Sequence, residues 1–263
     1  CMNTLKTDME GLKESLEKDG VLFEDGVILK NSLRISKVSD MSSLSAFKKG
    51  YFHVQDESSS LAVNILSPKK GENNLDVCAS PGGKTVLMAE IMENEGSITA
   101  RDIFDHRLQL IDDTAKRLGI DIIKTENFDA AELNEKDIEK YDRVLLDAPC
   151  SGFGLMRKKA DIRLTKNGND IDSLIKIQRQ MLSTVWQYVK KGGILVYSTC
   201  TVSKKENQKN IEWFIENFPF ETVDISEYVK NISSPDSKNG YIQLFTNVHK
   251  TDGFFIAKLR RKE

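Results

Sequence analysis

From residue 51 onward, short apolar runs of strand length alternate with stretches of helical periodicity, and this alternation is the strongest constraint on the fold. Such an order is typical of βαβ units, which build a parallel sheet covered by helices on both faces. The sequence therefore predicts an α/β fold with a doubly wound sheet. The expected strands are 75–78, 97–101, 120–125, 143–146, 194–197, 241–245 and 254–259, and the expected helices are 84–92, 105–118, 171–189 and 204–216.

The first fifty residues have a different pattern. A helical stretch ends near Gly20, and short strand-like pieces follow at 21–23, 27–29 and 33–35. We predict a small α+β N-terminal subdomain over residues 1–50 and the main domain over residues 51–263.

Composition excludes several classes of protein. No apolar run approaches the roughly 18 residues of a membrane span, and the N-terminus does not resemble a signal peptide, so we expect a cytoplasmic protein without a membrane partner. The net charge of −2 gives no general attraction to nucleic acid, so any RNA contact needs a local basic cluster. The cysteines at positions 1, 78, 150 and 200 lack disulfide or zinc spacing, which predicts reduced thiols and no metal.

A glycine-rich turn follows the first main strand, where ligands of open α/β sheets bind. Gly82 and Gly83 bring bare backbone to this edge, although a tight strand-to-helix turn alone also uses glycines. Lys84 opposes the helix dipole, so we expect it to face a carboxylate of the ligand or of the sheet. A phosphate-binding P-loop is disfavoured, because its first glycine is replaced by Cys78 and Pro81 removes a backbone donor.

An acidic residue, Asp102, ends the second main strand. That position holds ribose hydroxyls in folds of this type. The alternative role is a cap for the following helix, for which Asp105 is better placed. We favour ribose binding.

Two cysteines follow neighbouring predicted strands. Asp147 and Pro149 precede Cys150, and the proline forces the chain out of the sheet. Cys200 closes the next strand in the same manner. If these strands pair at about 4.8 Å, both thiols and Asp147 face one cleft beside the glycine-rich turn. Cys78 is interpreted as a small buried residue within its strand.

Several motifs together resemble the Sun/RsmB branch of the RNA 5-methylcytosine methyltransferases, which is related to the eukaryotic NSUN enzymes. The motifs are Val54-Gln-Asp-Glu-Ser58, Asp76-Val-Cys-Ala-Ser-Pro-Gly-Gly-Lys-Thr85, Leu146-Asp-Ala-Pro-Cys-Ser-Gly152, Tyr197-Ser-Thr-Cys-Thr201 with Glu206-Asn207, and Asp252-Gly-Phe-Phe-Ile-Ala-Lys258. The resemblance covers nearly the whole chain. It implies a Rossmann-like class I S-adenosylmethionine methyltransferase sheet with the small α+β subdomain in front of it.

The resemblance also implies a mechanism. Cys200 adds to carbon 6 of cytosine and makes carbon 5 nucleophilic, which is covalent catalysis. Cys150 assists loss of the carbon-5 proton and release of Cys200, and Asp147 hydrogen-bonds the base. A free thiol is only a few per cent ionised at neutral pH, so Cys200 needs activation, and Lys84 is a candidate for that role.

The implied cofactor is S-adenosyl-L-methionine. Its methionine part is expected to lie along the glycine-rich turn and its ribose at Asp102, while Asn127 or Asp129 is expected to meet the adenine. The full expected set is Cys78, Ala79, Ser80, Pro81, Gly82, Gly83, Lys84, Asp102, Asn127, Asp129 and Asp147.

A basic segment follows Cys150 and is expected to bind RNA phosphates. It contains Arg157, Lys158, Lys159 and Arg163. A cytosine within a duplex cannot reach a buried thiol, so the target should be single-stranded or flipped out. The resemblance favours small-subunit ribosomal RNA, with transfer RNA as a possible substrate, and we expect a monomer.

Relatives of this branch usually carry a helical RNA-binding domain that resembles the antitermination factor NusB ahead of this region. The chain starts too late to include it, so we expect either a truncated protein, for which we predict reduced RNA affinity, or a short relative.

Three other classes compete with this hypothesis. In a DNA cytosine methyltransferase, Cys150 would attack and Cys200 would be incidental. A non-catalytic RNA-binding assembly factor would have a damaged site, and a nucleotide hydrolase would bind ATP. The presence of two thiols favours the RNA enzyme.

Overall fold

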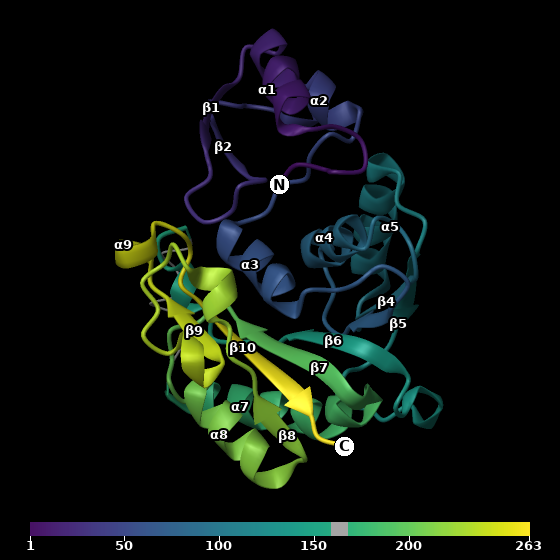
Figure 1. Ribbon diagram of the computed structural model, residues 1–263, viewed down its shortest axis with the longest axis vertical. Coiled ribbons are helices and arrows are strands. Elements are labelled where there is room, and N and C mark those ends of the chain that lie inside the picture. Colours follow the sequence, from purple (N-terminus) through teal and green to yellow (C-terminus); the bar gives the residue numbers. More distant parts are fainter. Residues whose placement is uncertain (159–167) are drawn as a thin grey trace.

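The computed structural model describes residues 1–158 and 168–263, and within them eight strands form one mixed sheet (Figure 1). The strand order is β5-β4-β3-β6-β7-β10-β8, and β9 pairs with β10. The pairs from β5 to β7 are parallel and those of β10 are antiparallel. The strands are β3 Asn73–Asp76, β4 Ser97–Asp102, β5 Ile123–Asn127, β6 Tyr141–Asp147, β7 Val189–Thr199, β8 Phe220–Thr222, β9 Tyr241–Leu244 and β10 Phe254–Arg261.

Helices cover both faces of this sheet (Figure 1). One face carries α3 Glu57–Leu66, α4 Gly83–Ile91 and α5 Asp105–Leu118, and the other carries α7 Gly168–Val185 and α8 Gln208–Asn217. Shorter helical segments are α9 Thr246–His249, η2 Glu135–Asp137, η3 Phe153–Leu155, η4 Trp186–Tyr188, η5 Ser226–Val229 and η6 Ser237–Asn239.

The apolar runs of the sequence arise because the central strands are buried on both faces. Leu145 of β6 and Val196 of β7 join the core under α3 and α4. Their neighbours Val144 and Leu195 join the core under α7 and α8. Successive side chains of a strand point to opposite faces, so a strand between two helical layers is apolar throughout. The predicted Rossmann-like α/β fold is confirmed.

Several predicted boundaries were wrong. β3 ends at Asp76, so Cys78 lies in the following turn and is half-buried. The predicted strand at 27–29 is a loop, whose backbone amides bind a side chain. Helix α3 was missed because three serines, which are weak helix formers, occupy its first turn. The short edge strand β8 was also missed.

The N-terminal elements pack around an apolar cluster of their own, above α3 in Figure 1. They are α1 Met9–Lys18, β1 Leu22–Asp25, β2 Leu33–Ser36, η1 Met41–Ser43 and α2 Ser45–Lys48. Phe52 belongs to the same cluster as Leu12 and Leu16. The predicted domain boundary between residues 50 and 51 stays a prediction.

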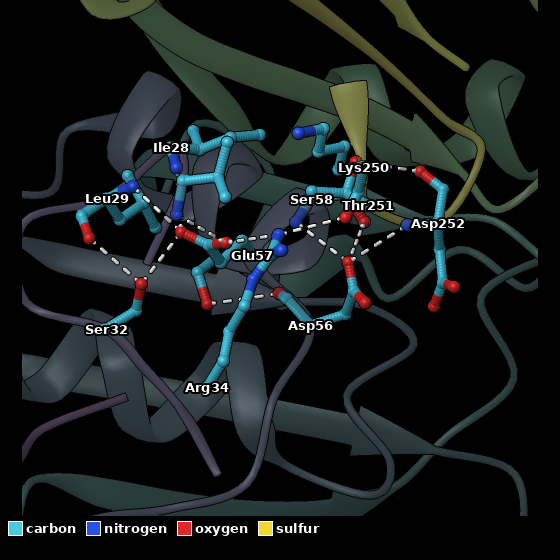
Figure 2. Close-up of polar contacts among 12 residues, drawn as sticks. Ile28, Leu29, Ser32, Arg34, Asp56, Glu57, Ser58, Lys250, Thr251 and Asp252 are labelled. Carbon is cyan, nitrogen blue, oxygen red and sulfur yellow. Dashed lines mark hydrogen bonds and ion pairs between the residues drawn. The ribbon is translucent and has the colours of Figure 1, made fainter. Parts of the chain in front are cut away.

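A buried carboxylate attaches this N-terminal group to α3. Glu57 accepts hydrogen bonds from the backbone amides of Val27, Ile28 and Leu29 at 2.9–3.0 Å and from the Ser32 hydroxyl at 2.8 Å, as Figure 2 shows for the last three. Arg34 Nη2 lies 3.1 Å from the same carboxylate. Burial opposes ionisation, but these donors outweigh it and hold the pKa of Glu57 below its ordinary value.

No helix among the described residues is long and apolar enough to cross a membrane.

We predict that Glu57→Ala lowers the free energy of unfolding by about 2–4 kcal/mol, because several backbone amides lose their acceptor together. Urea unfolding followed by circular dichroism measures this change. Glu24→Ala, which alters an exposed side chain on β1, is the control and should change stability by less than about 0.5 kcal/mol. Equal effects of the two substitutions would contradict the anchoring role.

Candidate active site

Two cysteine thiols meet where β6 and β7 end. These strands pair in parallel with Asp147 opposite Ser198, so Cys150 and Cys200 leave the sheet side by side. The distance between their Sγ atoms is 3.1 Å. Both thiols and Asp147 line one cavity, which confirms the prediction that they share a cleft.

Close backbone contact joins the two cysteine loops. The amide of Gly154 donates to the carbonyl of Cys200 at 3.0 Å, and the amide of Gly253 donates to the carbonyl of Gly154 at 3.0 Å. A Cβ on Gly154 would lie 1.8 Å from the Gly253 oxygen. Glycine is therefore required at this crossing for steric reasons.

The Glu206-Asn207 pair, just before α8, braces both loops. The fully buried carboxylate of Glu206 accepts from the Ser151 amide at 2.9 Å and from the Ser151 hydroxyl at 2.6 Å. Asn207 accepts from the Thr199 hydroxyl at 2.6 Å and donates to the Thr201 carbonyl at 3.0 Å. One residue thus holds the loop of Cys150 and the next holds both neighbours of Cys200.

Lys84 faces a carboxylate of the sheet, as predicted. Its ammonium lies 2.6 Å from Asp147 Oδ2, while the Ser198 hydroxyl donates to Asp147 Oδ1 at 2.7 Å. Burial opposes the positive charge, but the Asp147 carboxylate outweighs it and holds the pKa of Lys84 above its ordinary value. Lys84 is therefore a fixed cation beside the thiols.

The two thiols have opposite pKa shifts. A hydrogen bond from the Cys150 thiol lowers the pKa of Cys200, and the positive charge of Lys84 adds to this effect against burial and the charge of Asp147. The same hydrogen bond and burial raise the pKa of Cys150 well above its ordinary value. These shifts favour ionisation of Cys200 over ionisation of Cys150.

The cavity beside the thiols has a volume of about 350 Å³. Its lining includes Cys78, Ser80 and Asp102 on one side and the rings of Phe104 and Phe128 on another. Burial raises the pKa of Cys78, so this thiol stays protonated. The set combines a carboxylate, loop backbone and aromatic surface, which is a typical lining for a nucleoside-containing ligand.

Neither Asp102 nor Asp105 occupies the N-cap position of α5. Asp102 Oδ1 accepts from the Phe104 amide at 3.1 Å, and the carboxylate lines the cavity. Asp105 is the first helical residue of α5, whereas Phe104 occupies the cap position without a side-chain bond. The interpretation of Asp105 as the better-placed cap was therefore wrong.

The predicted adenine contacts lie outside this cavity lining. Asn127 donates to Asp105 at 2.6 Å, and Asp129 accepts from the Ala131 amide at 2.8 Å. Phe128, which stands between them, lines the cavity instead. Sequence reasoning missed Phe128 and Phe104, although an aromatic residue within two positions of the end of each of two neighbouring strands was a usable signal.

Other residues of the glycine-rich turn face a second cavity. Ala79, Pro81, Gly83 and Lys84 line another cavity on the side of the N-terminal elements. Gly82 has a φ of 102°, and a Cβ there would lie 3.0 Å from Ile111. This turn therefore separates two cavities.

The predicted RNA-binding segment is only partly described. Lys158 Nζ lies 3.0 Å from Asp56 and 2.7 Å from Asp252, and Figure 2 shows the Asp252 amide donating to the Asp56 carboxylate. Arg157 is exposed. Lys159 and Arg163 lie outside the described residues.

Within residues 1–158 and 168–263, no cluster of three or more His, Cys, Asp or Glu side chains is arranged to hold a metal ion.

We predict that Cys150→Ala raises the pKa of Cys200, because the lowering hydrogen bond is lost. The midpoint of the pH profile for iodoacetamide alkylation of Cys200, located by peptide mass spectrometry, should move to higher pH. Cys78→Ala is the control and should leave this midpoint in place. A midpoint that stays fixed in Cys150→Ala would contradict the interaction between the thiols.

Sequence comparisons agree with this site. Residues 63–260 match the family described as "16S rRNA methyltransferase RsmB/F". A Bacillus subtilis protein named "Probable ribosomal RNA small subunit methyltransferase B" is 39% identical over 99% of this chain. A Pyrococcus horikoshii protein named "tRNA (cytosine(72)-C(5))-methyltransferase" is 36% identical over 90% of it. This chain spans 59% of the length of each of these two relatives.

A solved structure supports the same assignment. The crystal structure of NSun6 from Pyrococcus horikoshii with SFG superposes with a TM-score of 0.89 at 25% sequence identity, and the match covers 100% of this chain and 90% of that one. Together with the match over residues 63–260, the paired thiols at the ends of β6 and β7 place this chain in the RsmB/F family of 16S rRNA methyltransferases.

Proposed function

We propose that this chain is the catalytic part of an S-adenosylmethionine-dependent RNA (cytosine-5)-methyltransferase that acts on small-subunit ribosomal RNA. The observation that carries the proposal is the thiol pair, in which Cys200 and Cys150 lie 3.1 Å apart with pKa values shifted in opposite directions. Covalent addition to a pyrimidine needs one ionised thiol, and release of the product needs a second group nearby. The names of the relatives support RNA as the substrate.

The cavity beside the thiols fits the proposed cofactor. Asp102 offers a carboxylate to the ribose hydroxyls, and Phe104 and Phe128 offer apolar rings to the adenine. Phe104 is 43% exposed, which a flat ring packed against it would reduce. When bound, S-adenosylmethionine would supply the methyl group that carbon 5 of cytosine receives.

In the first step, the Cys200 thiolate forms a bond to carbon 6 of cytosine. The electron pair of the 5,6 double bond moves toward the N3 edge of the ring, and carbon 5 becomes nucleophilic. Asp147, held in place by Lys84 and Ser198, would accept a hydrogen bond from the amino group, and the positive charge of Lys84 would face the charge that develops at the N3 edge. A preorganised charged pair in a water-poor cleft stabilises the developing charge without rearrangement.

In the last step, carbon 5 loses its proton and the bond from carbon 6 to Cys200 breaks. The electrons of the broken C–H bond restore the ring double bond, and Cys200 leaves as a thiolate. Cys150 would assist by accepting the proton directly or through water. Once Cys200 is bonded to the base, its negative charge no longer raises the pKa of Cys150, so Cys150 can release its own proton to water and then accept the carbon-5 proton as a thiolate.

A DNA-type mechanism, with Cys150 as the nucleophile, is the second candidate. The high pKa of Cys150 argues against it, because a protonated thiol attacks slowly.

Transfer RNA stays an alternative substrate, since one relative is named for it. Arg157 and the following basic residues would contact RNA phosphates, and we expect a cytoplasmic monomer.

Covalent trapping tests the proposal. The wild type, Cys150→Ala and Cys200→Ala are incubated with S-adenosylmethionine and RNA that contains 5-fluorocytosine or cytosine, and denaturing gels then detect protein–RNA adducts. With cytosine, an adduct should accumulate in Cys150→Ala, because release is blocked, and should be absent in Cys200→Ala. Cys78→Ala is the matched thiol control and should behave as the wild type.

The reverse pattern would move the nucleophile to Cys150. The proposed reaction would be contradicted if an RNA binds in the presence of S-adenosylmethionine but forms no adduct with any variant.

A further inference from the structure

A second cavity, of about 450 Å³, lies between the N-terminal elements and the glycine-rich turn. Met41 and Phe47 form an apolar wall, and Gln55, Lys84 and Arg117 contribute polar groups. A volume in this range is typical of a small-ligand site with a few placed polar groups. The thiols and Asp147 line the other cavity, and the roles discussed above involve only the glycine-rich turn of this one, so its remaining wall, with Met41, Phe47, Gln55 and Arg117, is unassigned.

The two cavities adjoin at the reaction centre. Lys84 lines the second cavity, and its ammonium lies 2.6 Å from Asp147, which lines the first. The turn packs closely on the Gln55 side chain at Gly83. A Cβ at this position would lie 3.3 Å from the Gln55 amide carbon. A strand of RNA with its cytosine at the thiols would therefore place an adjacent nucleotide near this amide.

A buried pair fixes the direction of the Gln55 side chain. His53 Nδ1 lies 3.2 Å from the Glu90 carboxylate, and both side chains are at most 3% exposed. His53 Nε2 lies 3.0 Å from Gln55 Oε1. With its oxygen held by His53, Gln55 keeps its NH₂ group as a donor for a ligand in the cavity.

Phe47 is also fixed in place. The guanidinium of Arg117 stacks 3.8 Å from the centre of its ring. Nη1 of Arg117 donates to the carbonyls of Phe47 and Phe52, both at 3.0 Å. A positioned aromatic wall beside a positioned amide is the means by which proteins bind unstacked bases of single-stranded RNA.

We propose that this second cavity binds the base of a nucleotide adjacent to the target cytosine, with Phe47 as its apolar wall and Gln55 as a hydrogen-bond donor to an acceptor on its edge. The inference rests on the proposed function, because a cytosine that is flipped to the thiols leaves its neighbour unstacked. The cavity is then a determinant of sequence context around the modified base.

Binding of short fluorescent RNAs by the 263-residue chain tests this inference. The oligonucleotides carry the target cytosine with an intact base or an abasic sugar on its 5′ or 3′ side, and anisotropy gives each Kd. One of the two abasic RNAs should bind the wild type about 10-fold more weakly. Phe47→Ala and Gln55→Glu should each weaken binding of the intact RNA about 10-fold and remove most of the penalty for that abasic sugar.

Matched substitutions control for general damage. Gln109→Ala on α5 and Phe245→Ala, an exposed ring next to α9, should keep the wild-type penalty. S-adenosylmethionine affinity, measured by calorimetry, should be the same in all variants. Equal binding of intact and abasic RNAs by the wild type, or penalties that add independently in Phe47→Ala and Gln55→Glu, would overturn the inference. Methyl transfer is measured separately, so a failure of the proposed function would be seen without affecting this result.

Discussion

Parallel pairing of β6 with β7 is the constraint on which the site depends. Parallel strands bring their carboxyl ends to the same edge, so two residues that are fifty positions apart in sequence leave the sheet as neighbours. The burial of both strands on both faces fixes their register, because a slip by one residue would exchange the side chains of the two cores. The stability of the fold therefore holds the two sulfur atoms together.

Beyond the strands, the two cysteine loops are held in place by hydrogen bonds to buried polar side chains. Glu206 and Asn207 are consecutive residues, yet their side chains bond to different cysteine loops. A fully satisfied network of this kind in a low-dielectric interior is rigid, and breaking one member leaves the others unpaired. Rigidity matters here because each thiol sets the pKa of the other only while their separation is maintained.

The sequence was informative where local chemistry determines structure. Alternating apolar runs predicted the sheet, and Pro149 predicted that Cys150 stands just beyond a strand. The helix dipole predicted that Lys84 faces a carboxylate, and left open whether the ligand or the sheet supplies it. Sequence could not supply contacts between distant segments. Lys158 was predicted to bind RNA as part of the basic segment after Cys150, and nothing near it in sequence indicated that Asp56 and Asp252 contact it from remote parts of the chain. The RNA contact stays a prediction. Phe128 was overlooked in favour of its polar neighbours for a similar reason, since cavity lining depends on packing.

The crossing of Gly154 with Gly253 has a consequence for how such a protein can evolve. Most tight contacts join two side chains, so a larger residue on one side can be offset by a smaller residue on the other. At this crossing both partners are already without a side chain, and a Cβ on Gly253 would lie 2.7 Å from the Gly154 backbone. No second substitution can therefore compensate for a change at either position. This pair of positions is therefore constrained by backbone packing alone, independently of the side chains that the two loops carry.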